Sequence, residues 1–120
     1  MLYVLDTNIL SAMRFDPSLV SAGDVATTSF NLSEILYGAL RRPDLADVQS
    51  FARFVVETIP VLDFDSEAAA WYAKKRHELN FVKPNVDAMI AAVAVVHDAT
   101  LVTRNVRHFP FEELNVVTRC

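Results

Sequence analysis

The amino-acid sequence predicts an α/β fold with a central parallel sheet that helices cover on both faces. Short apolar and β-branched segments alternate along the chain with longer segments whose apolar residues recur at helical spacing, and that alternation is typical of parallel sheets. Of the 120 residues, 52% are apolar and only two are glycine, which favours a helix-rich, well-buried domain. A chain of this length can bury one substantial core, so we expect one domain over residues 1–120.

Five short segments are predicted as strands because apolar and β-branched residues stand there between polar or turn-forming ones. The first stops at Asp6 and reads as fully buried, whereas the last is the weakest of the five. In chain order the predicted strands cover residues 2–5, 25–27, 60–62, 100–103 and 116–118.

Five helices are predicted between these strands from capping residues and from the spacing of apolar side chains. Thr28 or Ser29 can cap the second helix, which Pro43 stops, and Asp65 and Asn85 can cap the last two. The last helix is apolar almost all round, which predicts that it is buried. In chain order the predicted helices cover residues 7–14, 29–41, 44–57, 66–79 and 86–96.

Charge and cysteine content exclude several classes of protein. The net charge is −4, so a nucleic-acid partner would have to be held by a local basic patch and bound cations. The single cysteine, Cys120, excludes a disulfide framework within the chain and a cysteine-based metal site. The N-terminus does not resemble a signal peptide, and the longest apolar run, over residues 88–96, is too short for a membrane span. We therefore expect a soluble cytoplasmic protein without a membrane partner.

Asp6 is the first candidate for chemistry because it directly follows the first strand. In parallel sheets, ligands lie beyond the carboxyl ends of the strands, near the point where strand order reverses. A carboxylate there can enter the cleft above the sheet, and Thr7 and Asn8 can orient it by hydrogen bonds. The alternative is that Asp6 only caps the helix that starts at Thr7, which aspartate does well.

Glu34 and Asp87 lie in the first halves of two predicted helices. Glu34 has mostly apolar neighbours, which favours partial burial and a bound metal; the alternative is a solvated residue at the helix edge. Asp87 opens the most apolar helix and is the only charge between Lys83 and His97, although the helix dipole also favours an acid there. Asp6, Glu34 and Asp87 together predict a Mg²⁺ or Mn²⁺ site suited to phosphodiester hydrolysis.

The segment after the fourth strand offers groups that could assist such a site. Thr103 and Asn105 carry neutral oxygens that can contact a metal-bound water, and Arg104 and Arg107 carry guanidinium groups that can meet phosphate. The alternative for each is ordinary loop chemistry.

A basic run on the fourth predicted helix comprises Lys74, Lys75 and Arg76. Such a run is usually a solvated face, but with an RNA substrate these side chains would be the first candidates for contacts with the backbone. The three histidines are scattered and lack the spacing of a zinc site.

Four segments of the chain stand out in a fixed order: YVLDTN at 3–8, SFNLSEILYG at 29–38, DAMIAA at 87–92 and LVTRNVRHF at 101–109. In this order they resemble PIN-domain ribonucleases, and within them the VapC-like toxins of toxin–antitoxin pairs. The resemblance covers essentially the whole chain. It implies a three-layer α/β/α sandwich and Mg²⁺- or Mn²⁺-dependent cleavage of RNA. It also implies a homodimer and an antitoxin partner whose tail covers the active site.

The resemblance also carries over to individual residues. Asp6, Glu34 and Asp87 fall on the acidic positions of the family, and Thr103 and Asn105 fall in its fourth motif. That motif often adds an acid at the position of His108 or of Asn105, and neither is acidic here, so one metal is expected to bind better than two. Two alternatives stay open. The first is a catalytically weak PIN domain that binds RNA or a partner. The second is a receiver-like domain, in which an Asp would be usual at the position of Asn8.

Overall fold

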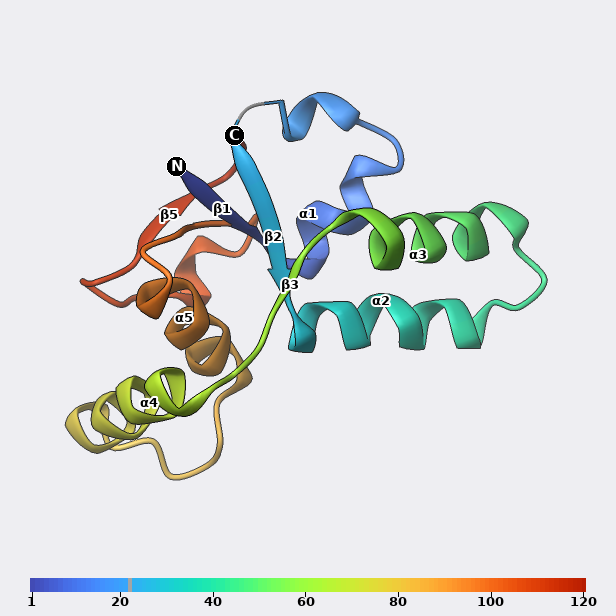
Figure 1. Cartoon of the computed structure of the whole chain (residues 1–120). Coiled ribbons are helices and arrows are strands. Elements are labelled where there is room, and N and C mark those ends of the chain that lie inside the picture. Colours follow the sequence, from blue (N-terminus) through green and yellow to red (C-terminus); the bar gives the residue numbers. More distant parts are fainter. Residues whose placement is uncertain (22) are drawn as a thin grey trace.

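Five parallel strands form one sheet in the order β3-β2-β1-β4-β5 (Figure 1). The computed structural model describes residues 1–21 and 23–120. The strands are β1 (Leu2–Leu5), β2 (Asp24–Thr28), β3 (Val61–Leu62), β4 (Thr100–Val102) and β5 (Asn115–Val117). The prediction of a parallel sheet is therefore confirmed.

Five α-helices occupy the predicted segments, each within two residues of the predicted bounds. They are α1 (Thr7–Met13), α2 (Ser29–Arg41), α3 (Ala46–Thr58), α4 (Ser66–Leu79) and α5 (Val86–Val96). The predicted N-caps are present, since side chains of Thr28, Asp65 and Asn85 each accept a hydrogen bond from a backbone N–H in the first turn. Two short 3-10 helices, Pro17–Leu19 and Val106–His108, were not predicted.

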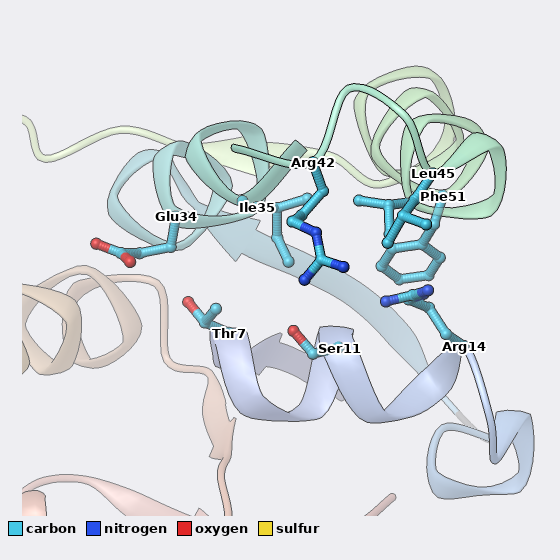
Figure 2. Close-up of a pocket in the computed structure, with 10 residues that line it drawn as sticks. Thr7, Ser11, Arg14, Glu34, Ile35, Arg42, Leu45 and Phe51 are labelled. Atoms are coloured by element: carbon cyan, nitrogen blue, oxygen red, sulfur yellow. The ribbon is translucent and has the colours of Figure 1, made fainter. Parts of the chain in front are cut away.

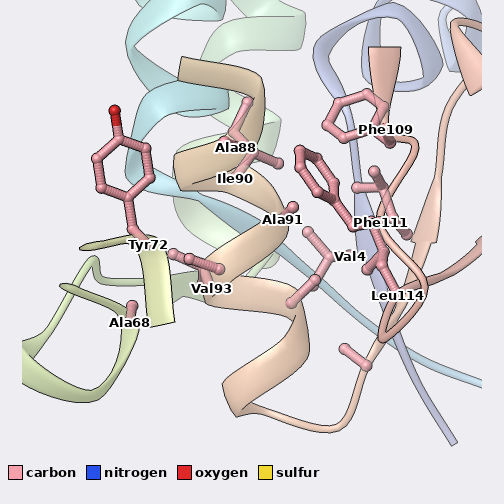
Figure 3. Close-up of a cluster of buried hydrophobic side chains, with 14 residues drawn as sticks. Val4, Ala68, Tyr72, Ala88, Ile90, Ala91, Val93, Phe109, Phe111 and Leu114 are labelled. Carbon is pink, nitrogen blue, oxygen red and sulfur yellow. The ribbon is translucent and has the colours of Figure 1, made fainter. Parts of the chain in front are cut away.

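The helices cover both faces of the sheet, which gives the expected three layers (Figure 1). On one face Val4 and Leu101 pack with the buried side of α5 and with α4, in the cluster drawn in Figure 3. On the other face Leu5 and Val102 pack with α1, α2 and α3. Alternate residues of one strand point to opposite faces of a sheet, so β1 contributes to both cores.

Helix α5 is buried along nearly its whole length, as its apolar sequence predicts. Its small residues Ala88, Ala91, Ala92 and Ala94 let it lie close to the sheet and to α4. The hydroxyl of Tyr72 on α4 accepts a hydrogen bond from the backbone N–H of Asn85, 3.0 Å away, and so fixes the start of α5. The first turn of α5 therefore has a defined position near the carboxyl end of β1.

The order of the strands places the candidate residues at the carboxyl end of the sheet, around its central strand β1. The chain runs from β1 outward to β2 and β3 on one side, and returns to β4 and β5 on the other. The backbone N–H of Asp6 donates to Val102 O at 3.0 Å, so the end of β1 is paired with the end of β4. The reversal of strand order thus coincides with Asp6, where ligands of such sheets bind. Within the described part of the chain, no helix is long and apolar enough to cross a bilayer.

Candidate active site

Asp6 is held by four hydrogen bonds and is only 8% exposed. Its Oδ1 accepts from the Thr7 N–H at 2.9 Å and from Asn31 Nδ2 at 2.7 Å. Its Oδ2 accepts from the Thr103 hydroxyl at 2.7 Å and, at a longer 3.4 Å, from Asn8 Nδ2. The carboxylate therefore caps α1 and at the same time keeps a fixed orientation at the end of β1, so the two roles considered for it are compatible.

Asn31 is a buried polar residue whose role sequence reasoning missed. It is 1% exposed, and its Nδ2 donates to both Asp6 Oδ1 and Thr7 Oγ1, the latter at 3.0 Å. Its Oδ1 accepts from the hydroxyl of Thr28 at 2.6 Å. An Asn three residues after an N-cap threonine, on the buried side of α2, was the available signal. Through Asn31 the start of α2 is joined to the carboxylate of Asp6.

Asp87 lies in the first turn of α5 with its side chain 41% exposed. Partial burial raises the pKa of its carboxyl above the ordinary value, and the negative charge of Asp6 acts in the same direction. The imidazole of His108 lowers the pKa, since its Nδ1 stands 3.5 Å from Asp87 Oδ2. Asp87 is thus close enough to Asp6 for their charges to interact, and a cation between them would relieve the repulsion.

Glu34 lies on α2 and is exposed. The two alternatives for Glu34 were partial burial and solvent exposure, and the structure shows solvent exposure. It nevertheless faces other candidate residues across a cleft of about 480 Å³ at the end of the sheet. The polar residues that line this cleft are Asp6, Thr7, Asn8, Asn31, Ser33, Glu34, Asp87 and Asn105.

The cleft suits a hard cation that keeps part of its water shell. Its donors are carboxylate and amide oxygens, which Mg²⁺ and Mn²⁺ prefer. Across residues 1–21 and 23–120, no three His, Cys, Asp or Glu side chains are close enough together to form a coordination shell by themselves. Since Mg²⁺ is often bound through one or two carboxylates with several waters, an open arrangement around Asp6 and Asp87 fits it.

Thr103 lies behind Asp6 rather than in the cleft. It is fully buried, and besides its bond to Asp6 its oxygen accepts from Asn8 Nδ2 at 3.3 Å and from the backbone N–H of Asn105 at 3.0 Å. Its hydroxyl is therefore committed to positioning Asp6, which differs from the expected contact with a metal-bound water. Asn105 does line the cleft.

Arg104 and Arg107 are exposed beside a shallow depression formed by residues 104–108. The backbone N–H of Arg104 donates to Asn8 Oδ1 at 3.0 Å, which holds this segment against α1. Neither guanidinium lines the cleft.

The basic run on α4 is largely engaged within the protein. Lys75 forms ion pairs with Glu113 at 2.7 Å and Glu78 at 3.1 Å, and Arg76 donates to the carbonyls of Phe81 and Val82. Lys74 stays exposed. None of the three lines the cleft, so the structure does not bring this run together with Asp6 and Asp87.

Comparison with known proteins gives a family model and curated relatives that span the chain. The PIN domain model matches residues 3–115. The chain is similar to Ribonuclease VapC2 of Rickettsia felis, with 30% identity over 91% of this chain and 90% of the relative. It is also similar to Ribonuclease VapC19 of Mycobacterium tuberculosis, with 32% identity over 89% and 91% of the two chains.

Solved structures share the fold. A chain of VapBC2 from Rickettsia felis, bound to a DNA fragment from its promoter, matches with a TM-score of 0.79 and 24% identity over 98% of both chains. A chain of DNA-bound VapBC from Salmonella typhimurium matches with a TM-score of 0.75 and 26% identity, again over 98% of both.

Proposed function

Because this chain belongs to the PIN-domain family, in the VapC-like group, we propose that it is a metal-dependent endoribonuclease and the toxin of a toxin–antitoxin pair. The observation that carries the proposal is that Asp6, Glu34, Asp87 and Asn105 line one cleft at the carboxyl end of β1. The match with the curated relatives spans about nine-tenths of their length, and these relatives are named ribonucleases, which supports RNA as the substrate. Residues 1–120 then act as one nuclease domain.

We assign the metal to Asp6 and Asp87, with Glu34 facing it across the cleft. When bound, Mg²⁺ or Mn²⁺ supplies an activated water and neutralises charge on the phosphate. Asp6 is suited to binding because four hydrogen bonds fix its oxygens before any ligand arrives. Asp87 must be deprotonated to bind, and His108 favours that state.

The remaining polar residues of the cleft orient the substrate. Asn105 presents an amide group that can hold the attacking water or a phosphate oxygen. The amide of Asn8 is already bonded within the protein, to Asp6, Thr103 and the backbone of Arg104. Thr103 and Asn31 act as positioning residues, because they contact Asp6 and are themselves buried. Arg104 and Arg107 stand beside the cleft, where they would meet the RNA strand as it leaves.

The partners that we assign are RNA, an antitoxin and a second copy of the chain. One of the structures that share this fold is a toxin–antitoxin complex from Klebsiella pneumoniae, and another is a member of the VapBC family of toxin–antitoxin systems from Mycobacterium tuberculosis. By analogy, an antitoxin would bind this chain and block the cleft.

A second candidate is a PIN domain with little catalytic power that serves to bind RNA or a partner. It is favoured by the wide spacing of the acids in the described chain and by His108, a non-acidic residue beside Asp87. RNA affinity without turnover would identify it.

The test is cleavage of a mixed RNA pool by the purified, antitoxin-free protein in Mg²⁺ or Mn²⁺. Parallel samples contain EDTA, the Asp6→Asn variant, or Asp44→Asn as a control for loss of one exposed acid. We expect cleavage to vanish with EDTA and Asp6→Asn and to persist with Asp44→Asn. Calorimetric titration with Mn²⁺ gives an independent readout, and binding unaffected by Asp6→Asn would sink the assignment.

A further inference from the structure

A second cavity adjoins the cleft, between α1, α2 and the start of α3. It has a volume of about 310 Å³ and is drawn in Figure 2. Its polar lining consists of Thr7, Ser11, Arg14, Arg42 and Glu34, and apolar side chains form the rest of its wall. We call it the Arg42 pocket.

Arg42 gives this pocket a positive charge, and Glu34 is the carboxylate that lines the same pocket. In the described chain no carboxylate forms an ion pair with Arg42, whereas Arg14 pairs with Asp47 at 2.6 Å. Figure 2 shows the Arg42 guanidinium reaching from the end of α2 towards Ser11 on α1. The backbone of Arg42 is well fixed, because its carbonyl accepts from the N–H of Leu45 at 3.1 Å and from Gln49 Nε2 at 3.1 Å. The side chain therefore starts from a fixed point at the rim of the pocket, and its guanidinium is left to adjust to a ligand.

Gly38 borders open space in the wall of the pocket. It lies in the interior of α2 and lines the pocket, and a Cβ built there meets no heavy atom within 4 Å. A larger side chain would therefore meet no steric clash at its Cβ here. Glycine nevertheless occupies this position, although it weakens the interior of a helix. The empty volume in front of Gly38 is available to a ligand.

The pocket and the cleft form one continuous surface. Thr7 and Glu34 line both, so a chain-like ligand that fills the cleft can reach the pocket without leaving the protein. An arginine guanidinium is well matched to the oxygens of a phosphate. The net charge of −4 gives no general attraction for a polyanion, so local cations must provide it.

We propose that the Arg42 pocket binds a backbone phosphate of the RNA strand next to the one that is cleaved. The inference rests on the proposed ribonuclease function and adds a substrate contact to it. Arg42 makes the charged contact, and the hydroxyls of Ser11 and Thr7 donate to the same phosphate or its ribose. An acidic peptide could also meet Arg42, but the continuity with the nuclease cleft favours RNA.

The test compares two variants, each of which removes one positive charge from a different part of the surface. Arg42→Gln alters the pocket, and Arg53→Gln removes an exposed arginine from α3, where it lines a different, apolar depression. Affinity for a fluorescent RNA oligonucleotide is measured by anisotropy in EDTA at several salt concentrations, and KM and kcat are measured in Mg²⁺. We expect Arg42→Gln to weaken binding about 10-fold and to reduce the salt slope by about 0.7. Its kcat should stay near that of the wild type, and Arg53→Gln should change little.

Gly38→Leu is the second variant, since it fills the pocket without altering charge. It should raise KM in the same way while circular dichroism shows an intact fold. The inference is overturned if Arg42→Gln and Arg53→Gln bind RNA alike, or if Arg42→Gln weakens only the binding of a peptide from the antitoxin. If the wild-type protein neither binds nor cleaves RNA, the proposed function itself fails.

Discussion

The hydroxyl of Thr103 donates a 2.7 Å hydrogen bond to Oδ2 of Asp6, although 97 positions separate the two residues. We predict that Thr103→Val weakens Mn²⁺ binding about 10- to 100-fold, since loss of a partner behind a metal ligand has effects of that size. Thr103→Ser should keep most of the affinity because it keeps the hydroxyl. Calorimetric titration measures the affinity, and Thr100→Val, a Thr-to-Val change in the strand that precedes Thr103, is the matched control. Equal affinities for the two valine variants would contradict the prediction.

Asn31→Ala should destabilise the protein by more than the loss of a few side-chain atoms would, because several buried hydrogen bonds are lost with them. The change removes the donor to Asp6 and Thr7 and leaves the buried hydroxyl of Thr28 without its acceptor. We expect a loss of about 1–3 kcal/mol in the free energy of unfolding, measured in urea. Ser33→Ala, which removes an exposed hydroxyl from the same helix, should stay within about 0.5 kcal/mol of the wild type.

Asp87 should make the metal-free protein less stable as pH rises. Its pKa is raised in the folded state, so between its ordinary value of 3.8 and the raised value the folded chain holds the proton more tightly than the unfolded chain. Stability from this group is thus lost as pH rises through that window. Asp87→Asn should melt at a higher temperature than the wild type at pH 7 in EDTA, and the difference should shrink towards pH 3.8. If the difference in melting temperature between Asp87→Asn and the wild type grew as the pH was lowered, the predicted direction of the effect would be wrong.

Adding Mn²⁺ should reverse the order of the two proteins at pH 7, because only the wild type keeps the carboxylate that we assign to the metal. The same melting experiment, repeated with the ion, tests this.

His108→Asp should strengthen metal binding. His108 Nδ1 lies 3.5 Å from Asp87 Oδ2, so an acid at this position can reach the same cation. We expect about 10-fold tighter Mn²⁺ binding, from the added ligand charge. We also expect a lower melting temperature without metal, from carboxylate repulsion. His108→Asn, which removes the imidazole without adding a charge, separates the two effects.

The sequence was most informative about local structure. Strand β1 and helices α2, α4 and α5 could be predicted from capping residues and apolar spacing, because both are properties of neighbouring residues. The cap of α3 was not, since Leu45 precedes that helix without a side-chain bond. The fold class followed from the alternation of elements and is confirmed by the strand order.

Contacts between distant residues were beyond such reasoning. Lys75 looked available to a nucleic acid until the structure paired it with Glu113, 38 residues away. The same holds for Thr103, whose partner is at the other end of the chain, and for Asn31, whose burial depends on how α2 meets β1. The candidate acids themselves could be named from sequence, and their roles stay a prediction that the experiments above address.

The central place of β1 in the sheet bears on when the protein can become active during its synthesis. β1 is made first, yet its neighbour β4 begins at Thr100, and the hydroxyl that steadies Asp6 comes from residue 103. A nascent chain that ends before these residues has Asp6 but lacks the strand beside it and the bonds that orient it. The cleft is therefore assembled only after residue 103 has been synthesised, so products that are truncated before this residue are expected to be inert.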